Sequence, residues 1–190
     1  MCKDRYIFNI NEARKAGLAK KEISGLIKHG QVERISRGVY RKIDPTNPII
    51  TDAELFESAT FIVGKPSAIC LHSALHFYGI HCESEPKEQW IMVPFEKRCA
   101  HQSIRVFRTR NPKWTIGIDK HQNFNITNLE RTIIESLTNL KTIEQKIGIA
   151  ALSMALNRRL TNLHKLIAMA GSLKVIHRVS EIIKIVSHLK

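Results

Sequence analysis

Apolar residues recur at helical spacing near the start of the chain. Ile23, Leu26 and Ile27 follow the i, i+3, i+4 pattern, while lysines occupy the other faces of the same segment. Residues 7–16 have an asparagine at their start and basic residues followed by a glycine at their end, which are helix-start and helix-stop signals. The pattern therefore predicts two short helices, over residues 7–16 and 19–28.

A β-hairpin is predicted directly after the second helix. Gly30 is a typical helix-ending residue, and two β-like runs follow at 32–35 and 39–40, separated by a Ser-Arg-Gly turn at 36–38. Two short helices followed by a hairpin are the outline of a winged helix-turn-helix, in which the second helix enters the major groove of DNA. We therefore predict a DNA-binding domain over residues 1–43.

The rest of the chain predicts a second domain after a turn-rich linker at 44–50. Helical signals extend over 51–79, beginning with a capping box of Thr51 and Glu54, then β-like runs over 88–126, and helical patterns again over 128–189. The expected helices are 51–63, 67–78, 129–137, 143–157, 162–170 and 175–189, and the expected strands are 89–93, 104–108, 115–118 and 124–126. The prediction is an α+β fold: a winged helix-turn-helix followed by a mixed α/β domain over 51–190, with a small, mostly antiparallel sheet and a helical tail.

The positive charge of the chain lies in two blocks. Residues 1–43 contain 11 basic and 4 acidic side chains (+7), residues 44–94 contain 2 and 7 (−5), and residues 95–190 contain 17 and 6 (+11). A basic helix and hairpin suit a polyanion, because each neutralised phosphate releases counterions. A solvated basic face is the alternative. The residues that we expect to bind double-stranded DNA are Lys20, Lys21, Ser24, Lys28, Arg34, Arg37, Arg41 and Lys42.

Cysteine spacing and hydropathy predict a soluble, cytoplasmic protein. The four cysteines form no CxxC pair, and the first ten residues contain no apolar leader segment. The longest apolar run, 147–156, is too short to span a bilayer. No cofactor is expected.

The sequence patterns that would indicate a catalytic site are weak. Ser73 lies in the middle of a predicted helix without the flanking glycines of a nucleophile elbow. A metal-dependent nuclease is an alternative that would use Glu85, Lys87 and Asp52, but Pro86 would break the strand that usually displays such a pair. We therefore expect no enzymatic activity.

A zinc site is also disfavoured. His72 and His76 lie four residues apart, as two ligands on one helix face would. No HExxH motif is present, and the cysteines lack the two-residue spacing of structural knuckles. The residues considered for zinc are Cys70, His72, His76, His81, Cys82, Cys99 and His101. No metal is expected.

Several short sequence motifs occur in order along nearly the whole chain. Each motif alone is weak, but their combination is specific. They are Gly17-Leu18, His29-Gly30, residues 33–40 (ERISRGVY), residues 72–75 (HSAL) with 78–80 (YGI), residues 90–94 (WIMVP), and residues 128–132 (NLERT) with Glu135. Together they resemble the AbiEi-like antitoxins of type IV toxin–antitoxin systems. The resemblance implies an N-terminal winged helix and a C-terminal antitoxin domain.

The resemblance also implies a function. Such a protein would repress its own operon by binding an inverted repeat in its promoter, as a monomer or weak dimer, and would counteract a nucleotidyltransferase-type toxin. The chain departs from the family in one respect, because only residues 1–6 precede the first predicted helix, where relatives have a full helix. The alternatives are weak DNA affinity, dimerisation over the gap, an upstream start, or a protein-interaction module with a degenerate winged helix.

Basic residues in the second domain provide a further expected surface. Arg131 near a helix start would contact the toxin, or else fold back on a neighbouring strand or carboxylate. Arg158, Arg159 and Lys165 have the spacing of a solvent-facing helix surface, and would add a second phosphate-binding surface or face an acidic partner.

Overall fold

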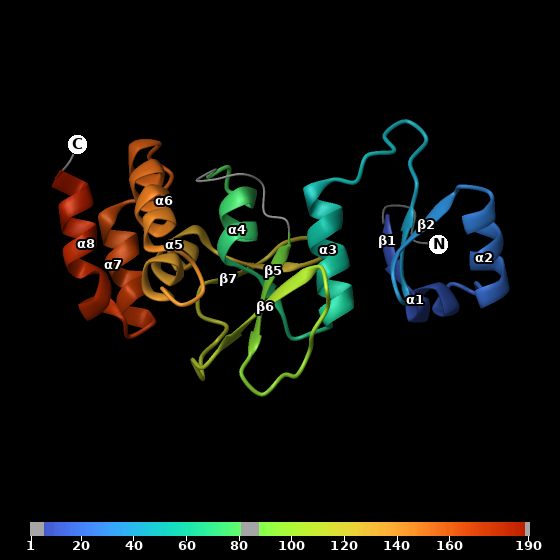
Figure 1. Cartoon of the computed structure of the whole chain (residues 1–190), viewed down its shortest axis with the longest axis horizontal. Helices are drawn as coiled ribbons and strands as arrows, with labels where there is room; N and C mark the ends of the chain where they lie inside the picture. The colour runs from blue at the N-terminus through green and yellow to red at the C-terminus, as the bar shows by residue number, and fades with distance from the viewer. Residues whose placement is uncertain (1–5, 81–87, 189–190) are drawn as a thin grey trace. The chain divides into compact units, whose positions relative to one another are not determined.

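The computed structural model describes residues 6–80 and 88–188, and it has an α+β fold with two compact units (Figure 1). The first unit covers residues 1–65 and the second covers residues 66–190. This division lies beyond the predicted linker at 44–50, because the helix that follows the linker packs on strands of the first unit.

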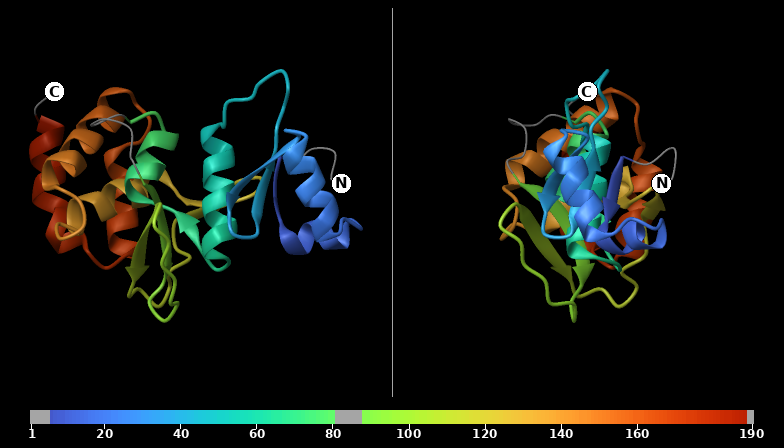
Figure 2. Two further views of the ribbon diagram at one scale, coloured as in Figure 1. Left: turned by 45° about the vertical axis from the view of Figure 1, so that its right-hand side comes forward. Right: turned by 90° about the vertical axis from the view of Figure 1, so that its right-hand side faces the viewer.

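Over residues 6–65, the N-terminal unit contains three helices and a three-stranded antiparallel sheet. The elements are β1 (Ile7–Asn9), α1 (Ile10–Lys15), α2 (Lys20–Lys28), β2 (Val32–Ser36), β3 (Val39–Lys42) and α3 (Asp52–Val63). The strand order is β1-β3-β2. Helices α2 and α3 lie on opposite sides of this sheet (Figures 1 and 2), so both faces of the sheet are covered within the unit.

Residues 7–9 are a strand, so the prediction of a helix from Ile7 was wrong for these three residues. Ile7 pairs with Arg41 of β3, and Phe8 stacks on Tyr40 with ring centroids 5.6 Å apart. The Asn9 side chain accepts hydrogen bonds from the backbone N–H groups of residues 11 and 12 and so starts α1. Because Asn9 is the N-cap, the helix begins only at Ile10, and the apolar residues before the cap pair with β3.

The core between the helices and the sheet confirms Ile23 and Leu26 of the predicted apolar stripe of α2 but not its third member, because Ile27 is 37% exposed. Ile23 is buried, and it packs with Phe8, Ala13, Val32 and Tyr40. Leu26 and other half-buried apolar side chains flank this cluster. The opposite face of α2 is therefore left for solvent or a ligand.

The predicted hairpin is confirmed. In the ladder, Val32 pairs with Lys42 and Ser36 pairs with Val39, with an irregularity after Arg34. Gly38 has a φ of +80° at the tip, a conformation that side chains other than glycine rarely adopt.

The C-terminal unit contains a five-stranded sheet and five helices within the described residues. The strands are β4 (Ala68–Ile69), β5 (Gln89–Pro94), β6 (Ile104–Thr109), β7 (Ile118–Lys120) and β8 (Asn125–Thr127). The helices are α4 (Leu71–Phe77), α5 (Leu129–Thr138), α6 (Gln145–Asn157), α7 (Leu163–Ser172) and α8 (Ile176–His188). Helices α5 to α8 gather on one side of the sheet (Figure 1).

The sheet is mixed, so the prediction of a mostly antiparallel sheet was wrong. In the order β6-β5-β4-β8-β7, the pairs β5–β6 and β4–β8 are parallel and the other two are antiparallel. The connection over residues 95–103 returns the chain to the starting end of β5, which makes β6 parallel to it.

Two further boundaries were wrong. Residues 68–69 form the central strand β4 and not the start of a helix, because this fully buried pair hydrogen-bonds to strands on both sides. Residues 115–117 are a turn, and the strand begins at Ile118. The carbonyls of Trp114 and Ile116 in this turn accept hydrogen bonds from Arg131, which a local sequence pattern does not reveal.

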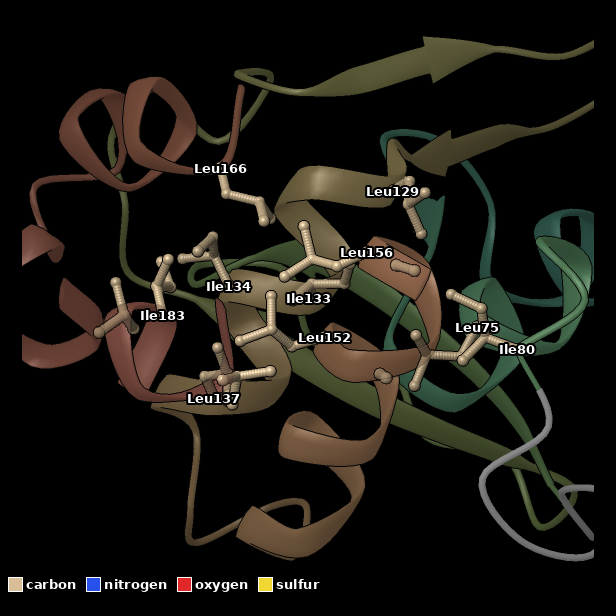
Figure 3. Packing of buried hydrophobic residues seen from close by; sticks show 14 of the residues in the cluster. Leu75, Ile80, Leu129, Ile133, Ile134, Leu137, Leu152, Leu156, Leu166 and Ile183 are labelled. Carbon is tan, nitrogen blue, oxygen red and sulfur yellow. The ribbon is translucent and has the colours of Figure 1, made fainter. Parts of the chain in front are cut away.

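The predicted helical tail is confirmed and supplies the largest core. Ile133, Ile134 and Leu137 of α5 lie among Leu152 of α6 and Leu166 of α7 (Figure 3). Ile183 of α8 also joins this cluster. Within the described residues, no helix is long and apolar enough to span a membrane.

Candidate nucleic-acid interface

Helix α2 presents a basic outer face. Its inner side is fixed by buried Ile23, whereas Lys20, Lys21 and Lys28 are exposed. Ser24 is also exposed, and its hydroxyl donates to the Lys20 carbonyl over 3.1 Å. The Ser24 oxygen can still accept a hydrogen bond, so this helix face offers three cations and a polar group.

The hairpin adds further exposed cations. Arg34 and Arg37 are exposed, with Arg37 in the turn just before Gly38. The Nε of Arg34 donates to the Ser36 carbonyl over 3.3 Å, a bond that uses one of the five N–H groups of the guanidinium. Lys42 is exposed at the far end of β3 from the tip. Because α2 packs on β2, helix and hairpin form one body.

The acidic side chains of this region form internal bonds. Glu12 accepts from the Asn9 backbone N–H over 3.2 Å, and Glu22 accepts from the Ala19 backbone N–H over 2.5 Å, each capping a helix. Glu33 accepts from Arg41 over 2.9 Å. The negative charges therefore stabilise the fold, and most of the positive charges remain exposed on helix and hairpin.

Arg41 does not belong to this exposed surface. It is only 2% exposed, and its guanidinium donates to Glu54 over 3.0 Å and to Glu33 over 2.9 Å. The carbonyls of Pro48 and Ile49 accept its terminal N–H groups, each over 2.8 Å. Arg41 therefore fastens the hairpin to the linker and to α3. The sequence contained a signal for this, because successive strand residues face opposite sides and Lys42 faces away from Arg41.

The ion pair between Glu54 and Arg41 could not be predicted from the sequence. Glu54 forms the predicted capping box with Thr51, whose backbone N–H donates to Glu54 over 2.8 Å. Burial raises the pKa of Glu54, but hydrogen bonds from Arg41 and Thr51 outweigh burial and lower it below its usual value. One carboxylate thus starts α3 and holds Arg41.

Arg131 is fully buried, so it does not lie on a surface that a partner could reach. Its guanidinium donates to Glu135 from two nitrogens at 3.0 Å, and to the carbonyls of Trp114 and Ile116. Burial raises the pKa of Glu135, and the Arg131 charge opposes that shift. Of its two predicted roles, the structure shows the fold back on a carboxylate.

The other basic candidates of the C-terminal unit are exposed. Arg158 donates to the Gly79 carbonyl over 2.6 Å, and Arg159 and Lys165 are exposed near it in sequence. Large apolar side chains are exposed in the same segment, namely Leu160 (40%), Leu163 (38%) and Ile167 (45%). We call these six residues, which lie at the end of α6, in the turn after it and in α7, the α6–α7 set.

The residues considered for catalysis or metal binding have structural contacts. The Ser73 hydroxyl is buried, accepting from the Trp90 backbone N–H over 2.8 Å and bonding Gln89 over 3.2 Å. Cys70 is fully buried, which raises the pKa of its thiol well above the usual value. His72 packs against Trp90 with ring centroids 5.1 Å apart.

Some of these candidates cannot be placed. His81, Cys82, Glu85 and Lys87 lie outside the described residues. In the part of the chain that is described, no three acidic, histidine or cysteine side chains are grouped so that they could hold a metal ion.

Comparison with known proteins relates both parts of the chain to other molecules. The crystal structure of the RV2827C protein from Mycobacterium tuberculosis matches with a TM-score of 0.64 and 13% sequence identity, over 96% of this chain and 72% of that one, which shows a shared fold. No curated protein sequence gives a significant match. Residues 3–41 match the family described as "Transcriptional regulator, AbiEi antitoxin". The segment that contains α1, α2 and most of the hairpin thus confirms the resemblance of this chain to the AbiEi antitoxin family of transcriptional regulators.

Proposed function

We propose that the N-terminal unit is a winged helix-turn-helix that binds double-stranded DNA, with α2 in the major groove and the hairpin on the backbone. The observation that supports this most directly is the overlap of the family match with the basic surface. The segment matched by a family of transcriptional regulators, residues 3–41, includes α2 and most of the hairpin, on which exposed lysines and arginines gather. The proposed contacts are Lys20, Lys21, Ser24, Lys28, Arg34, Arg37 and Lys42.

The dimensions of α2 agree with this role. An α-helix with its side chains is about 10–12 Å across, and the major groove is about 12 Å wide, so the width of the groove admits α2. One side of α2 is held by Ile23 and Leu26 against the sheet, so the lysine side can enter a groove without disturbing the core.

We further propose that the protein is an antitoxin that represses its own operon. An inverted repeat upstream of the gene would be its operator, because two copies of one unit read two half-sites related by symmetry. A nucleotidyltransferase-type toxin encoded nearby would be the activity that it counteracts. The family match supports a regulator and antitoxin, and the toxin class rests on the resemblance alone.

DNA binding is tested by fluorescence anisotropy with the upstream region of the gene and a scrambled duplex. The full chain should bind the upstream region more tightly, and affinity should fall steeply with salt. Lys21→Ala and Arg37→Ala should each weaken binding and lower the salt slope by about one. Lys141→Ala, which removes an exposed charge from the other unit, is the matched control and should change neither. Equal affinity for both duplexes would disprove the proposal.

A specific observation favours a second function, protein binding by the C-terminal unit. The α6–α7 set contains exposed leucine and isoleucine as well as basic residues, a composition that suits an acidic protein partner. Leu163→Glu with Ile167→Glu should abolish growth rescue in cells that co-express the neighbouring toxin gene, while leaving promoter binding intact. Undiminished rescue by this double variant would refute a role of Leu163 and Ile167 in neutralisation.

A further inference from the structure

Gly25 lies in the middle of α2, where the fold gives no reason for a glycine. A Cβ built on Gly25 would meet no atom within 4 Å, and its φ is not in the left-handed region. By contrast, Gly17, Gly30 and Gly38 have left-handed φ angles that favour glycine. Glycine destabilises a helix interior relative to alanine, so Gly25 lowers the stability of α2, and no contact within the fold requires a glycine there.

The position of Gly25 on the helix suggests what the missing side chain permits. Lys21, Gly25 and Lys28 follow i, i+4, i+7 spacing and therefore share one face, opposite buried Ile23. The two lysines are separated by about 10.5 Å along the helix axis, at a rise of 1.5 Å per residue. Gly25 therefore lies at the centre of a helix face that has no side chain at that point and a lysine toward each end.

We propose that Gly25 is the point at which the backbone of α2 lies directly against base edges on the floor of the major groove. Lys21 and Lys28 would then reach phosphates on either side, while the absent side chain leaves room for the bases. Glycine allows this kind of close backbone approach to a ligand. The inference rests on the proposed function and adds a residue that sets how deeply the helix enters.

The proposal predicts that one methyl group added at Gly25 raises the stability of the protein and lowers its affinity for DNA. Gly25→Ala should raise the melting temperature by about 2 °C or more, because alanine favours the helix and has open space there. The same variant should weaken binding to the upstream duplex about tenfold or more, because overfilling a close-packed contact is unfavourable. Gly25→Ser should weaken binding in the same direction.

The matched control is Gly171→Ala in α7. This glycine also lies in a helix, and its Cβ would also meet no atom within 4 Å. The control should not alter DNA affinity. Melting curves of the full-length variants give the melting temperatures, and anisotropy titrations give the DNA affinities. Lys21→Ala is measured in parallel.

The outcomes separate the two proposals. If Lys21→Ala weakens binding but Gly25→Ala and Gly25→Ser do not, the close approach at Gly25 is wrong and the DNA-binding proposal stands. If Gly25→Ala lowers the melting temperature, the glycine has a structural purpose and the inference is also wrong. If the wild-type chain shows no preference for its upstream duplex, the proposed function itself fails.

Discussion

At the scale of single residues, equal charges have different roles according to the face they occupy. Arg41 and Lys42 are adjacent in β3, yet Arg41 is buried against Glu54 while Lys42 is exposed. The alternation of side chains along a strand accounts for the difference. The exposure of Lys21 and Lys28 follows equally from the apolar stripe of α2, which the sequence predicts.

Replacing Arg41 should harm folding, whereas replacing Lys42 should not. Arg41→Ala leaves a buried Glu54 without its cation, which should lower the free energy of unfolding by about 3 kcal/mol. Lys42→Ala should change it by no more than about 0.5 kcal/mol. Urea denaturation monitored by circular dichroism measures both. Similar losses for the two variants would show that the Arg41 network contributes little.

The Arg41–Glu54 pair should also make stability depend on pH. Because the pKa of Glu54 is lower in the folded chain than in the unfolded one, its contribution is present above the unfolded pKa and is lost as pH falls through the folded pKa. Glu54→Gln should therefore destabilise the protein more at pH 7 than at pH 3. Urea titrations at the two pH values compare the variant with wild type. An equal difference at both would contradict the assigned shift.

The buried residues show where residue-level prediction stops. Arg131 bonds a carboxylate one helical turn away, which its spacing to Glu135 suggests, but also two carbonyls of a turn that lies outside its helix. Such partners are fixed by tertiary packing, so the sequence alone left both a surface role and a buried role open for Arg131.

At the scale of elements, local signals predicted helices well and short strands poorly. The helix at Asp52–Val63 starts at its predicted capping box, and α2 and the helical tail lie where periodicity places them. Strands β1 and β4 were read as helix starts, because two or three apolar residues fit either period. Their identity depends on partner strands distant in sequence.

Helix packing gives a test at this scale. Gly148 of α6 is buried, and a Cβ on it would lie 2.8 Å from the Ser136 carbonyl oxygen of α5. Gly148→Ala should therefore lower the free energy of unfolding by about 1–3 kcal/mol, despite the helix preference of alanine. Thermal denaturation beside Gly171→Ala provides the comparison. A stabilised Gly148→Ala protein would mean that α5 and α6 are not in such close contact.

At the scale of the whole molecule, the sequence predicted an α+β protein with a basic first unit, and the fold agrees. The family match covers residues 3–41, whereas the structural likeness spans 96% of the chain. The boundary between the compact units could not be predicted from composition, because α3 follows a turn-rich linker but packs back on β1 and β3. The arrangement of the mixed sheet likewise depends on long-range pairing.

The most direct test of the central claim, that the α2 face binds DNA phosphates, is the salt dependence of affinity for the upstream duplex. The triple variant Lys20→Ala, Lys21→Ala, Lys28→Ala is compared with a charge-matched control, Lys113→Ala, Lys120→Ala, Lys141→Ala, whose lysines are exposed in the other unit. The slope of log K against log salt should fall by about 2.7 for the α2 triple variant and hardly change for the control. Equal slopes for the two triple variants would contradict the account.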